Sequence, residues 1–396
     1  MLMSQEHNIM IIAGEVSGDM HAARLVKAVR NRAPDISFFG IGGNEMRAAG
    51  VEIIYNVKDM AVMGLVEMVR RLGFFRRVFN EMLVIARERR PDAVILVDYP
   101  GFNLRFAAKA HRLGIKTIYY ICPQVWAWNR SRIPQMARII DRLITIFPFE
   151  KKYFDGTGLK VDFVGHPLVD ETWKALSEPT MELPWNGEPR VALLPGSRAH
   201  EVDRILPVMW SAAALVEGKH PTASFIIAAP TPQVESIVRR KIADLSGYQQ
   251  STISNPQSAI ESPSRYSIVA GNTRQVLRQA HAAMVASGTA TIEAALMSCP
   301  MVITYKMAGL SYLLCKMMLK VDKIGMVNIV AGRQVCPEFV QRNATPEALA
   351  KAINPLLKDS PERFLMIQEL KNVSHALGPG GAEERAADIV IEELKD

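Results

Sequence analysis

The sequence predicts an α/β protein made of two doubly wound domains, each with a parallel sheet covered by helices on both faces. Short runs of β-branched and aliphatic residues alternate with longer helical patterns along the whole chain. Strands such as residues 93–97 (AVILV) are apolar at every position, which is typical of a parallel sheet buried on both faces. The alternation lapses once, between Ser177 and Pro189, and then resumes. At 396 residues the chain is long enough for two domains of about 200 residues.

Each strand predicted for the first half precedes a helical pattern. In order, these strands are residues 9–13, 37–39, 93–97, 116–120, 143–146 and 161–164. The second half repeats the arrangement, with strands predicted at residues 191–194, 224–228, 267–270, 283–286 and 302–305. The stretch of Glu, Pro, Asn and Gly between the halves has the composition of a linker, which predicts an N-terminal domain at residues 1–180 and a C-terminal domain at residues 188–377. Such sheets bind ligands beyond the carboxyl ends of their strands, so functional residues are expected in the loops there.

Composition and charge limit the classes of protein to consider. With 49% hydrophobic and 22% charged residues, the chain has the composition of a folded globular protein. The formal net charge of +7 favours negatively charged partners, such as phosphorylated substrates, anionic lipid surfaces or nucleic acid. The four cysteines form no C-x-x-C pair, so neither a disulfide framework nor a zinc ribbon is predicted. The polar start of the sequence and the lack of a run of roughly 18 apolar residues predict a cytoplasmic protein whose membrane contact is peripheral.

The first candidate binding site follows the predicted strand at residues 283–286. Ser287, Gly288 and Thr289 precede a helical pattern that contains Glu293. A glycine-containing turn at a helix N-terminus presents backbone N–H groups and the positive end of the helix dipole, so a diphosphate fits this position. Glu293 lies one helical turn beyond Thr289, where a carboxylate is placed to accept hydrogen bonds from ribose hydroxyls. An ordinary Ser or Thr helix cap is the alternative.

Arg198 provides a second candidate contact for phosphate. It ends the turn at residues 195–198 (PGSR), which follows the first strand of the C-terminal domain. Its guanidinium offers a planar fork to phosphate oxygens, and an ordinary surface Arg is the alternative. Downstream, Asn328, Arg333 and Gln334 supply polar groups either for binding or for loop capping. Neither an Asp-x-Asp pair nor a complete P-loop, dinucleotide, zinc-protease or hydrolase motif is present, so the site is predicted to hold a diphosphate without a metal or a cofactor.

Candidate catalytic residues of the N-terminal domain follow two of its strands. Glu15, Ser17 and Asp19 lie in the turn after the first strand, at the expected mouth of the site, and Asp98 directly follows the fully apolar strand. A carboxylate in that position is placed to take a proton from an acceptor hydroxyl, so Asp98 is the preferred general base, with Glu15 and Ser17 beside it. A plain turn cap is the alternative for Asp98. His166 is a second candidate base or else a structural residue at a domain edge.

Residues 61–85 differ from the rest of the N-terminal domain. Apolar side chains occupy two faces of the helical pattern, and four arginines are interleaved with them. The side chains expected to contact a membrane or acyl chains are those of Met63, Val66, Val69, Leu72, Phe74, Phe75 and Phe79. A basic amphipathic segment of this kind is typical of proteins that rest in a lipid interface. Burial between the sheet and a neighbouring subunit is the alternative.

Together these segments resemble the lipid-A-disaccharide synthases, which are bacterial glycosyltransferases of the GT-B architecture. The resemblance spans essentially the whole chain. Its most specific blocks, in order, are residues 14–19 (GEVSGD), 61–64 (AVMG), 123–128 (PQVWAW), 147–150 (FPFE), 194–198 (LPGSR), 287–290 (SGTA) and 328–333 (NIVAGR). One departure is visible, because Gly325, Met326 and Val327 precede Asn328 where Ser-Leu-Pro is expected in the family.

The resemblance implies two Rossmann-like domains facing a cleft, with a C-terminal helix at about residues 378–396 that returns to the N-terminal domain. It implies an inverting transfer of 2,3-diacylglucosamine from UDP-2,3-diacylglucosamine to the 6-hydroxyl of 2,3-diacylglucosamine 1-phosphate, giving the β-1,6-linked lipid A disaccharide 1-phosphate and UDP. It also implies an enzyme of Gram-negative bacteria, peripheral on the anionic surface of the inner membrane. The alternative is another UDP-sugar transferase or an epimerase of this architecture. Nucleic acid is not predicted as a partner, because basic residues are not interleaved with stacking aromatics. Monomer and homodimer are both left open.

Overall fold

A computed structural model describes the chain over residues 7–60, 71–252, 265–309, 312 and 321–395. The chain forms two compact units. The first comprises Met1–Pro167 together with Gly378–Asp396, and the second comprises Leu168–Leu377.

The boundary between the units lies earlier in the chain than the linker proposed from composition. Helix α9 (Leu168–Ser177) belongs to the second unit, because it packs against α12 (Thr273–Gln279) and α13 (Ala290–Leu296). Residues 168–180, which composition alone places with the N-terminal domain, therefore lie with the second unit. Composition marks where regular structure lapses, whereas packing decides to which core a helix belongs.

The first unit is built on a parallel sheet, which has seven strands over the described residues, in the order β3-β2-β1-β4-β5-β6-β7. The strands are β1 (Asn8–Ala13), β2 (Ser37–Gly42), β3 (Glu52–Asn56), β4 (Ala93–Val97), β5 (Lys116–Tyr120), β6 (Arg142–Thr145) and β7 (Lys160–Phe163). Every strand predicted for this half is present, to within three residues at its ends. The edge strand β3 was missed, because its half-buried side chains do not form the continuous apolar run of the inner strands.

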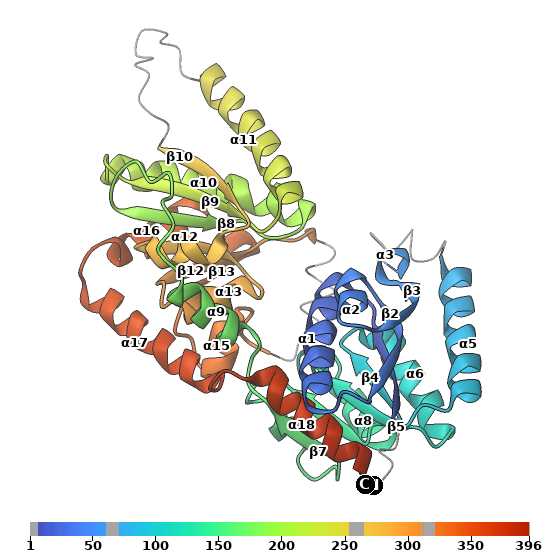
Figure 1. Cartoon of the computed structure of the whole chain (residues 1–396). Helices are drawn as coiled ribbons and strands as arrows, with labels where there is room; N and C mark the ends of the chain where they lie inside the picture. The colour runs from blue at the N-terminus through green and yellow to red at the C-terminus, as the bar shows by residue number, and fades with distance from the viewer. Residues whose placement is uncertain (1–6, 61–70, 253–264, 310–311, 313–320, 396) are drawn as a thin grey trace. The chain divides into compact units, whose positions relative to one another are not determined.

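Helices cover both faces of this sheet (Figure 1). They are α1 (Val16–Arg32), α2 (Asn44–Ala48), α3 (Val57–Met60), α5 (Leu72–Arg89), α6 (Pro100–Arg112), α7 (Val125–Trp128), α8 (Ile133–Ile139) and α18 (Ala382–Lys395), with 3₁₀ turns η1 (Arg130–Arg132) and η2 (Lys151–Phe154). Met10, Ile12 and Leu96 pack with α5, α6 and α8 in one core cluster. Alternate residues such as Ile9 and Ile11 are equally buried and face the other side, where α1 lies. The strands are apolar throughout because both faces are covered.

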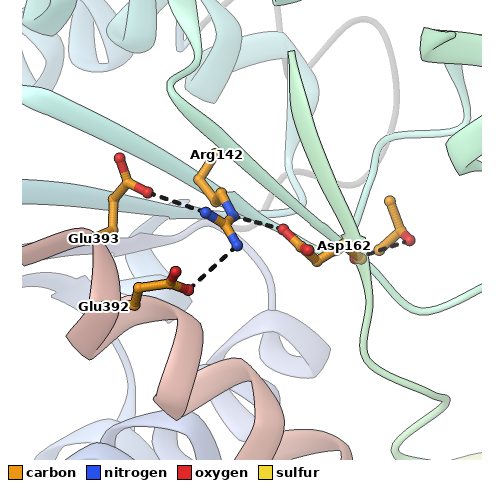
Figure 2. A network of polar contacts seen from close by, with 5 residues as sticks. Arg142, Asp162, Glu392 and Glu393 are labelled. Carbon is orange, nitrogen blue, oxygen red and sulfur yellow. Dashed lines mark hydrogen bonds and ion pairs between the residues drawn. The ribbon is translucent and has the colours of Figure 1, made fainter. Parts of the chain in front are cut away.

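The C-terminal helix α18 returns to the first unit, as predicted, and lies beside α1 (Figure 1). Arg142, at the start of β6, makes an ion pair with Asp162 at 2.5 Å and reaches Glu392 and Glu393 of α18 at 3.4 and 3.5 Å (Figure 2). The Lys116 ammonium also donates a hydrogen bond to the Glu393 carbonyl oxygen. These contacts join α18 to the amino ends of β5 and β6, at the opposite end of the sheet from the candidate catalytic residues.

The second unit also contains a parallel sheet, with six strands over its described residues in the order β10-β9-β8-β11-β12-β13. The strands are β8 (Arg190–Leu194), β9 (Ser224–Ala229), β10 (Tyr266–Ala270), β11 (Ala282–Ala286), β12 (Met301–Tyr305) and β13 (Glu338–Val340). The remaining helices are α10 (Ala199–Lys219), α11 (Pro232–Thr252), α15 (Met326–Ala331), α16 (Pro346–Ile353) and α17 (Pro361–Ala376), with 3₁₀ turns η4 (Gln341–Asn343) and η5 (Asn354–Leu357). All five predicted strands are confirmed, and the short edge strand β13 was missed. The doubly wound α/β prediction is therefore confirmed in both units.

Candidate active site

Asp98 lies at the carboxyl end of β4, where its backbone is held in an unusual conformation. Both Asp98 and Tyr99 have positive φ angles, of 45° and 49°, which residues with a β-carbon rarely adopt. The Asp98 N–H donates to the Tyr120 carbonyl oxygen at 3.1 Å. The Asp98 carbonyl oxygen accepts from Asn103 Nδ2 at 2.8 Å and from the Tyr119 hydroxyl at 2.5 Å. Asp98 and Tyr99 thus form a strained turn, and these hydrogen bonds hold the candidate base in that conformation.

The environment of the Asp98 carboxyl group suits a general base. Burial raises the pKa of Asp98 to about 6, and the negative charge of Glu15 acts in the same direction. A hydrogen bond from the Tyr99 backbone opposes both effects by favouring the charged form. Asp98 is therefore mostly ionised at neutral pH and binds a proton far more readily than an exposed Asp. A base whose pKa lies near the working pH is the most effective proton acceptor.

Glu15 is the N-cap residue of α1 and Ser17 lies in the first turn of that helix, and both are exposed. The Glu15 carboxylate acts electrostatically on both Asp98 and Tyr99. The expectation that Asp19 lies with them at the mouth of the site is wrong. The Asp19 side chain is buried and accepts hydrogen bonds from three backbone N–H groups at the start of α2, at 2.6 to 3.1 Å. Asp19 therefore shapes the fold, whereas Glu15 and Ser17 are accessible.

Tyr99 was not singled out from the sequence, yet it joins the loops that follow β1 and β4. A β-carbon placed on Gly14 would lie only 2.1 Å from the Tyr99 ring, so only glycine leaves room for this ring. Burial and the Glu15 charge both raise the pKa of the Tyr99 phenol. No sequence pattern indicates this contact, because it depends on the left-handed backbone of Asp98 and Tyr99.

His166, the second candidate base, is buried with its ring 4.9 Å from the ring of Phe147. It is therefore not open to an acceptor hydroxyl, and a structural role fits it better. Glu150, which the sequence placed only within a motif, is a buried carboxyl group whose pKa is raised by burial and, to a smaller extent, by the charge of Asp98. Its burial was not visible from the sequence.

In the second unit, Ser287, Gly288 and Thr289 follow β11 as predicted. The Ser287 hydroxyl donates to the Ile324 carbonyl oxygen at 2.7 Å, and the Thr289 side chain makes no cap hydrogen bond, so neither acts as an ordinary helix cap. Gly288 has a φ of 148°, and the space where its β-carbon would stand is open. Helix α13 has seven residues and contains Glu293, as the sequence predicts. The loop leaves an accessible backbone surface next to the exposed Thr289.

Glu293 lies on α13 as predicted, but an arginine that was not anticipated accompanies it. Arg274 lies 3.0 Å from a Glu293 carboxylate oxygen and also pairs with Glu171 of α9. Burial raises the pKa of Glu293, and the charge of Arg274 opposes this shift. Arg274 therefore brings a positive charge to the α13 region, where the sequence suggested only a carboxylate.

The backbone of Arg198 is fixed by hydrogen bonds, and its side chain is exposed. The buried Glu201 carboxylate accepts hydrogen bonds from the Ser197 and Arg198 backbone N–H groups, at 2.9 and 3.3 Å. Gly196 has a φ of 123°, and a β-carbon there would clash with Glu201. The Arg198 side chain is 67% exposed, and its guanidinium lies 3.7 Å from Glu201. A preformed loop thus presents the guanidinium for an anionic ligand.

The prediction that Asn328 contacts a ligand directly is corrected by its hydrogen bonds. Its side chain is fully buried, and its Nδ2 donates to the Cys336 carbonyl oxygen and to Glu338, at 2.8 and 2.7 Å. Its Oδ1 accepts from the Val335 and Cys336 backbone N–H groups, at 2.8 and 2.9 Å. Both donors and both acceptor positions are used, so Asn328 holds the loop between α15 and β13 and leaves nothing for a ligand.

Arg333 and Gln334 lie in that same loop, and both are exposed. Arg333 makes an ion pair with Glu369. Asn328 fixes the backbone of this loop, and the loop presents the side chains of Arg333 and Gln334 at the surface. Within the described residues, no group of three His, Cys, Asp or Glu side chains is arranged to hold a metal ion.

The segment expected to contact a membrane is only partly described. Met63, Val66 and Val69 lie outside the described residues. Leu72 is 56% exposed at the start of α5, and Phe74 and Phe75 are half-buried. Phe79 packs against Phe102 and Phe106 at ring distances of 5.3 and 5.7 Å, so it belongs mainly to the core. Among the helices that the structure describes, none is long and apolar enough to cross a membrane.

Comparison with known proteins identifies the family. A family model described as lipid-A-disaccharide synthetase matches residues 9–386. The chain belongs to the lipid-A-disaccharide synthase family. A lipid-A-disaccharide synthase of Anaeromyxobacter dehalogenans is 38% identical over 97% of this chain and 96% of its own length. One of Geobacter metallireducens is 39% identical over 98% and 97%. Membership of this family makes the chain a glycosyltransferase and confirms the resemblance found in the sequence.

Solved structures confirm the architecture expected for the lipid-A-disaccharide synthase family. The UDP-GlcNAc 2-epimerase from Neisseria meningitidis, bound to UDP-GlcNAc, aligns with a TM-score of 0.62 at 12% identity, over 97% of this chain and 100% of that one. The calicheamicin glycosyltransferase CalG4 aligns with a TM-score of 0.60 at 15% identity, over 99% of each chain. At such identities the similarity establishes the two-domain α/β fold of GT-B proteins and no activity.

Proposed function

We propose that this chain transfers 2,3-diacylglucosamine from UDP-2,3-diacylglucosamine to the 6-hydroxyl of 2,3-diacylglucosamine 1-phosphate, with inversion at the anomeric carbon. The products are the β-1,6-linked lipid A disaccharide 1-phosphate and UDP. The observation that carries this proposal is the family match over residues 9–386. The local chemistry at Asp98 supports it, because the reaction needs a base for the acceptor hydroxyl.

Asp98 takes the proton of the acceptor 6-hydroxyl as that oxygen attacks the anomeric carbon opposite the UDP. Two properties support this role, namely its place beyond the end of β4 and a pKa raised by burial to about 6. Glu15 adds a negative charge that increases the proton affinity of Asp98. Ser17, which is exposed in the first turn of α1, serves as a polar contact for the acceptor.

The second unit binds the UDP part of the donor. The exposed guanidinium of Arg198 and the open backbone at Gly288 and Thr289 are suited to the diphosphate. Positive charge at the departing diphosphate stabilises the transition state, because negative charge develops there. Glu293, oriented by Arg274, accepts hydrogen bonds from the ribose.

Arg333 and Gln334 complete this binding surface from the loop before β13. Asn328 fixes the backbone of this loop through its hydrogen bonds. In this arrangement Asn328 is a positioning residue for the donor site, since its own polar atoms are occupied.

The enzyme works at a membrane surface, because both substrates carry acyl chains. Leu72 and Phe74, at the start of α5, provide exposed or half-buried apolar contacts next to Arg71. Such a basic, apolar helix end suits an anionic lipid surface. The net charge of +7 acts in the same direction.

Release of UDP from different substrate pairs tests this proposal. The diacylated donor and acceptor together, in mixed detergent micelles, are expected to give UDP and the disaccharide in equal amounts. Unacylated UDP-GlcNAc is expected to give little of either, and omission of the acceptor should stop UDP release. Conversion of a UDP-sugar in the absence of acceptor would instead support an epimerase and contradict the transferase.

A further inference from the structure

The buried carboxyl group of Glu150 has no part in the reaction as described so far. Glu150 follows β6 and is 1% exposed. Its Oε1 accepts a hydrogen bond from the indole Nε1 of Trp126 at 3.1 Å, and its Oε2 accepts one from the Phe147 backbone N–H at 3.2 Å. Trp126 lies in α7, in the connection that follows β5. One carboxyl group thus ties together the segments that leave two neighbouring strands.

These segments begin at the carboxyl ends of β5 and β6, and β5 is the neighbour of β4, which Asp98 follows. The Asp98 N–H donates to the Tyr120 carbonyl oxygen at the end of β5, and the Ile121 N–H donates to the Ile144 carbonyl oxygen of β6. Ile121 has a φ of 67°, so the left-handed backbone found at Asp98 recurs at the adjacent strand end. This conformation is unfavourable above all for a β-branched residue, and it persists only where surrounding contacts fix it.

Trp126 is the most closely held residue of the segment that follows β5. Its ring packs against Phe149 and Tyr153, at ring distances of 4.8 and 6.2 Å. Its backbone carbonyl oxygen accepts a hydrogen bond from Arg130 Nε at 2.9 Å. Glu150 supplies the acceptor for its indole N–H. Removing that acceptor would leave a buried N–H group unsatisfied, which is unfavourable enough to move the segment.

Electrostatics links Glu150 to the candidate base. Burial raises the pKa of Glu150 to about 8, and the charge of Asp98 adds to this, whereas the hydrogen bonds from Trp126 and the backbone oppose it. Cys122, at the end of β5, lies within the same set of interacting groups, and burial together with Glu150 and Asp98 raises its pKa. Because the pKa of Asp98 is about 6, Asp98 ionises first, while Glu150 still holds its proton. Near neutral pH, of these two carboxyl groups, it is therefore Asp98 that carries the negative charge.

We propose that Glu150 is a positioning residue for the transfer reaction, which holds together the segments that follow β5 and β6, beside the end of β4, and so keeps Asp98 in its strained, partly dehydrated position. The proposal rests on the role of Asp98 as the base. It does not require Glu150 to touch a substrate. It predicts that changes at Glu150 alter the behaviour of Asp98 beyond any effect on folding.

The test compares Glu150→Met with Glu393→Met in the full-length enzyme, because methionine has a similar length and no carboxyl oxygen to accept the Trp126 N–H. Glu393 is a matched control, because it is 4% exposed and lies in the same unit, at the opposite end of the sheet. Glu150→Met is expected to lower kcat for UDP release by about 10- to 100-fold with little change in the donor KM, since small displacements of reacting groups have effects of this size. The acid limb of the kcat/KM profile should also move to lower pH, because water that reaches Asp98 lowers its pKa. Glu393→Met should leave that limb in place.

Trp126→Phe supplies an independent variant, because it keeps an aromatic ring and removes only the indole N–H. It should reproduce both effects, and the double variant with Glu150→Met should be no worse than either single one. A normal kcat and an unmoved acid limb in folded Glu150→Met and Trp126→Phe would overturn the proposal. A loss that only follows the folded fraction, with the limb unmoved, would overturn it as well, because Glu150 would then be merely structural. Failure of the base assignment is separate, since it would appear as normal turnover in Asp98→Asn.

Discussion

Replacement of Asp98 by Asn is expected to stabilise the folded protein at neutral pH while it removes the proposed base. Burial, assisted by Glu15, raises the pKa of Asp98 from its ordinary value of 3.8 to about 6. Between these pH values the folded state keeps a proton that the unfolded state has released, so the contribution of Asp98 to the free energy of unfolding falls as the pH rises. One pH unit is worth about 1.4 kcal/mol, so the ionised carboxylate costs at most about 3 kcal/mol above pH 6.

The substitution keeps the shape of the side chain and abolishes its charge. The expected gain in the free energy of unfolding is close to zero at about pH 4 and rises to at most about 3 kcal/mol at about pH 8. For a unit of this size, that upper limit corresponds to about 6 to 12 °C in Tm. Thermal melting followed by circular dichroism across this pH range measures the difference between the two proteins. Asp35→Asn is the control, because it removes the same charge from an exposed position of the first unit.

The pH dependence of this difference decides the outcome. A difference in Tm that grows with pH for Asp98→Asn, and not for Asp35→Asn, agrees with a base held in an unfavourable environment. A constant difference across the pH range, or a variant less stable than the native protein at about pH 8, would refute the reasoning from burial.

Three further variants test other parts of the site. Arg198→Ala should weaken UDP binding in calorimetry by about 1.5 to 3 kcal/mol with little change in Tm, because an ion pair as exposed as that of Arg198 with Glu201 contributes little to stability; unchanged affinity would remove Arg198 from the diphosphate site. Asn328→Ala should lower the free energy of unfolding in urea by about 2 to 4 kcal/mol, since it leaves buried loop groups without partners; full stability together with lost UDP binding would restore a direct contact. Leu72→Ser combined with Phe74→Ser should reduce sedimentation with anionic vesicles several-fold, whereas Leu113→Ser, an exposed control directly after α6, should not; equal sedimentation of all three proteins would contradict the membrane role.

The strand ends that carry the site were predictable from the sequence for a simple reason. A strand buried on both faces is apolar throughout, so the first polar side chain after the apolar run marks the point where the strand has ended. This places Asp98 after β4 and Ser287 after β11 without any knowledge of the tertiary structure. The edge strands β3 and β13 were missed because their half-buried residues lack that uniform pattern.

The roles of polar side chains within loops were less predictable. Asn328 and Asp19 are of residue types that often contact ligands. In this fold, however, their side-chain oxygens accept hydrogen bonds from backbone N–H groups that tertiary packing brings close to them. Arg274 reaches Glu293 from a helix that lies apart from it in the sequence. Burial of Glu150 likewise depends on the packing of Trp126. Each of these facts is a property of tertiary contacts, which spacing along the chain does not encode.

Turnover of Asp98→Asn on the diacylated substrate pair tests the proposed mechanism most directly. The measurement is kcat for UDP release, accompanied by the affinity for UDP from calorimetry. Loss of a general base is expected to lower kcat by about 100-fold or more. The UDP affinity should be unchanged, because the proposed UDP contacts belong to the second unit and Asp98 to the first. Turnover close to that of the native enzyme would contradict the assignment of Asp98 as the base.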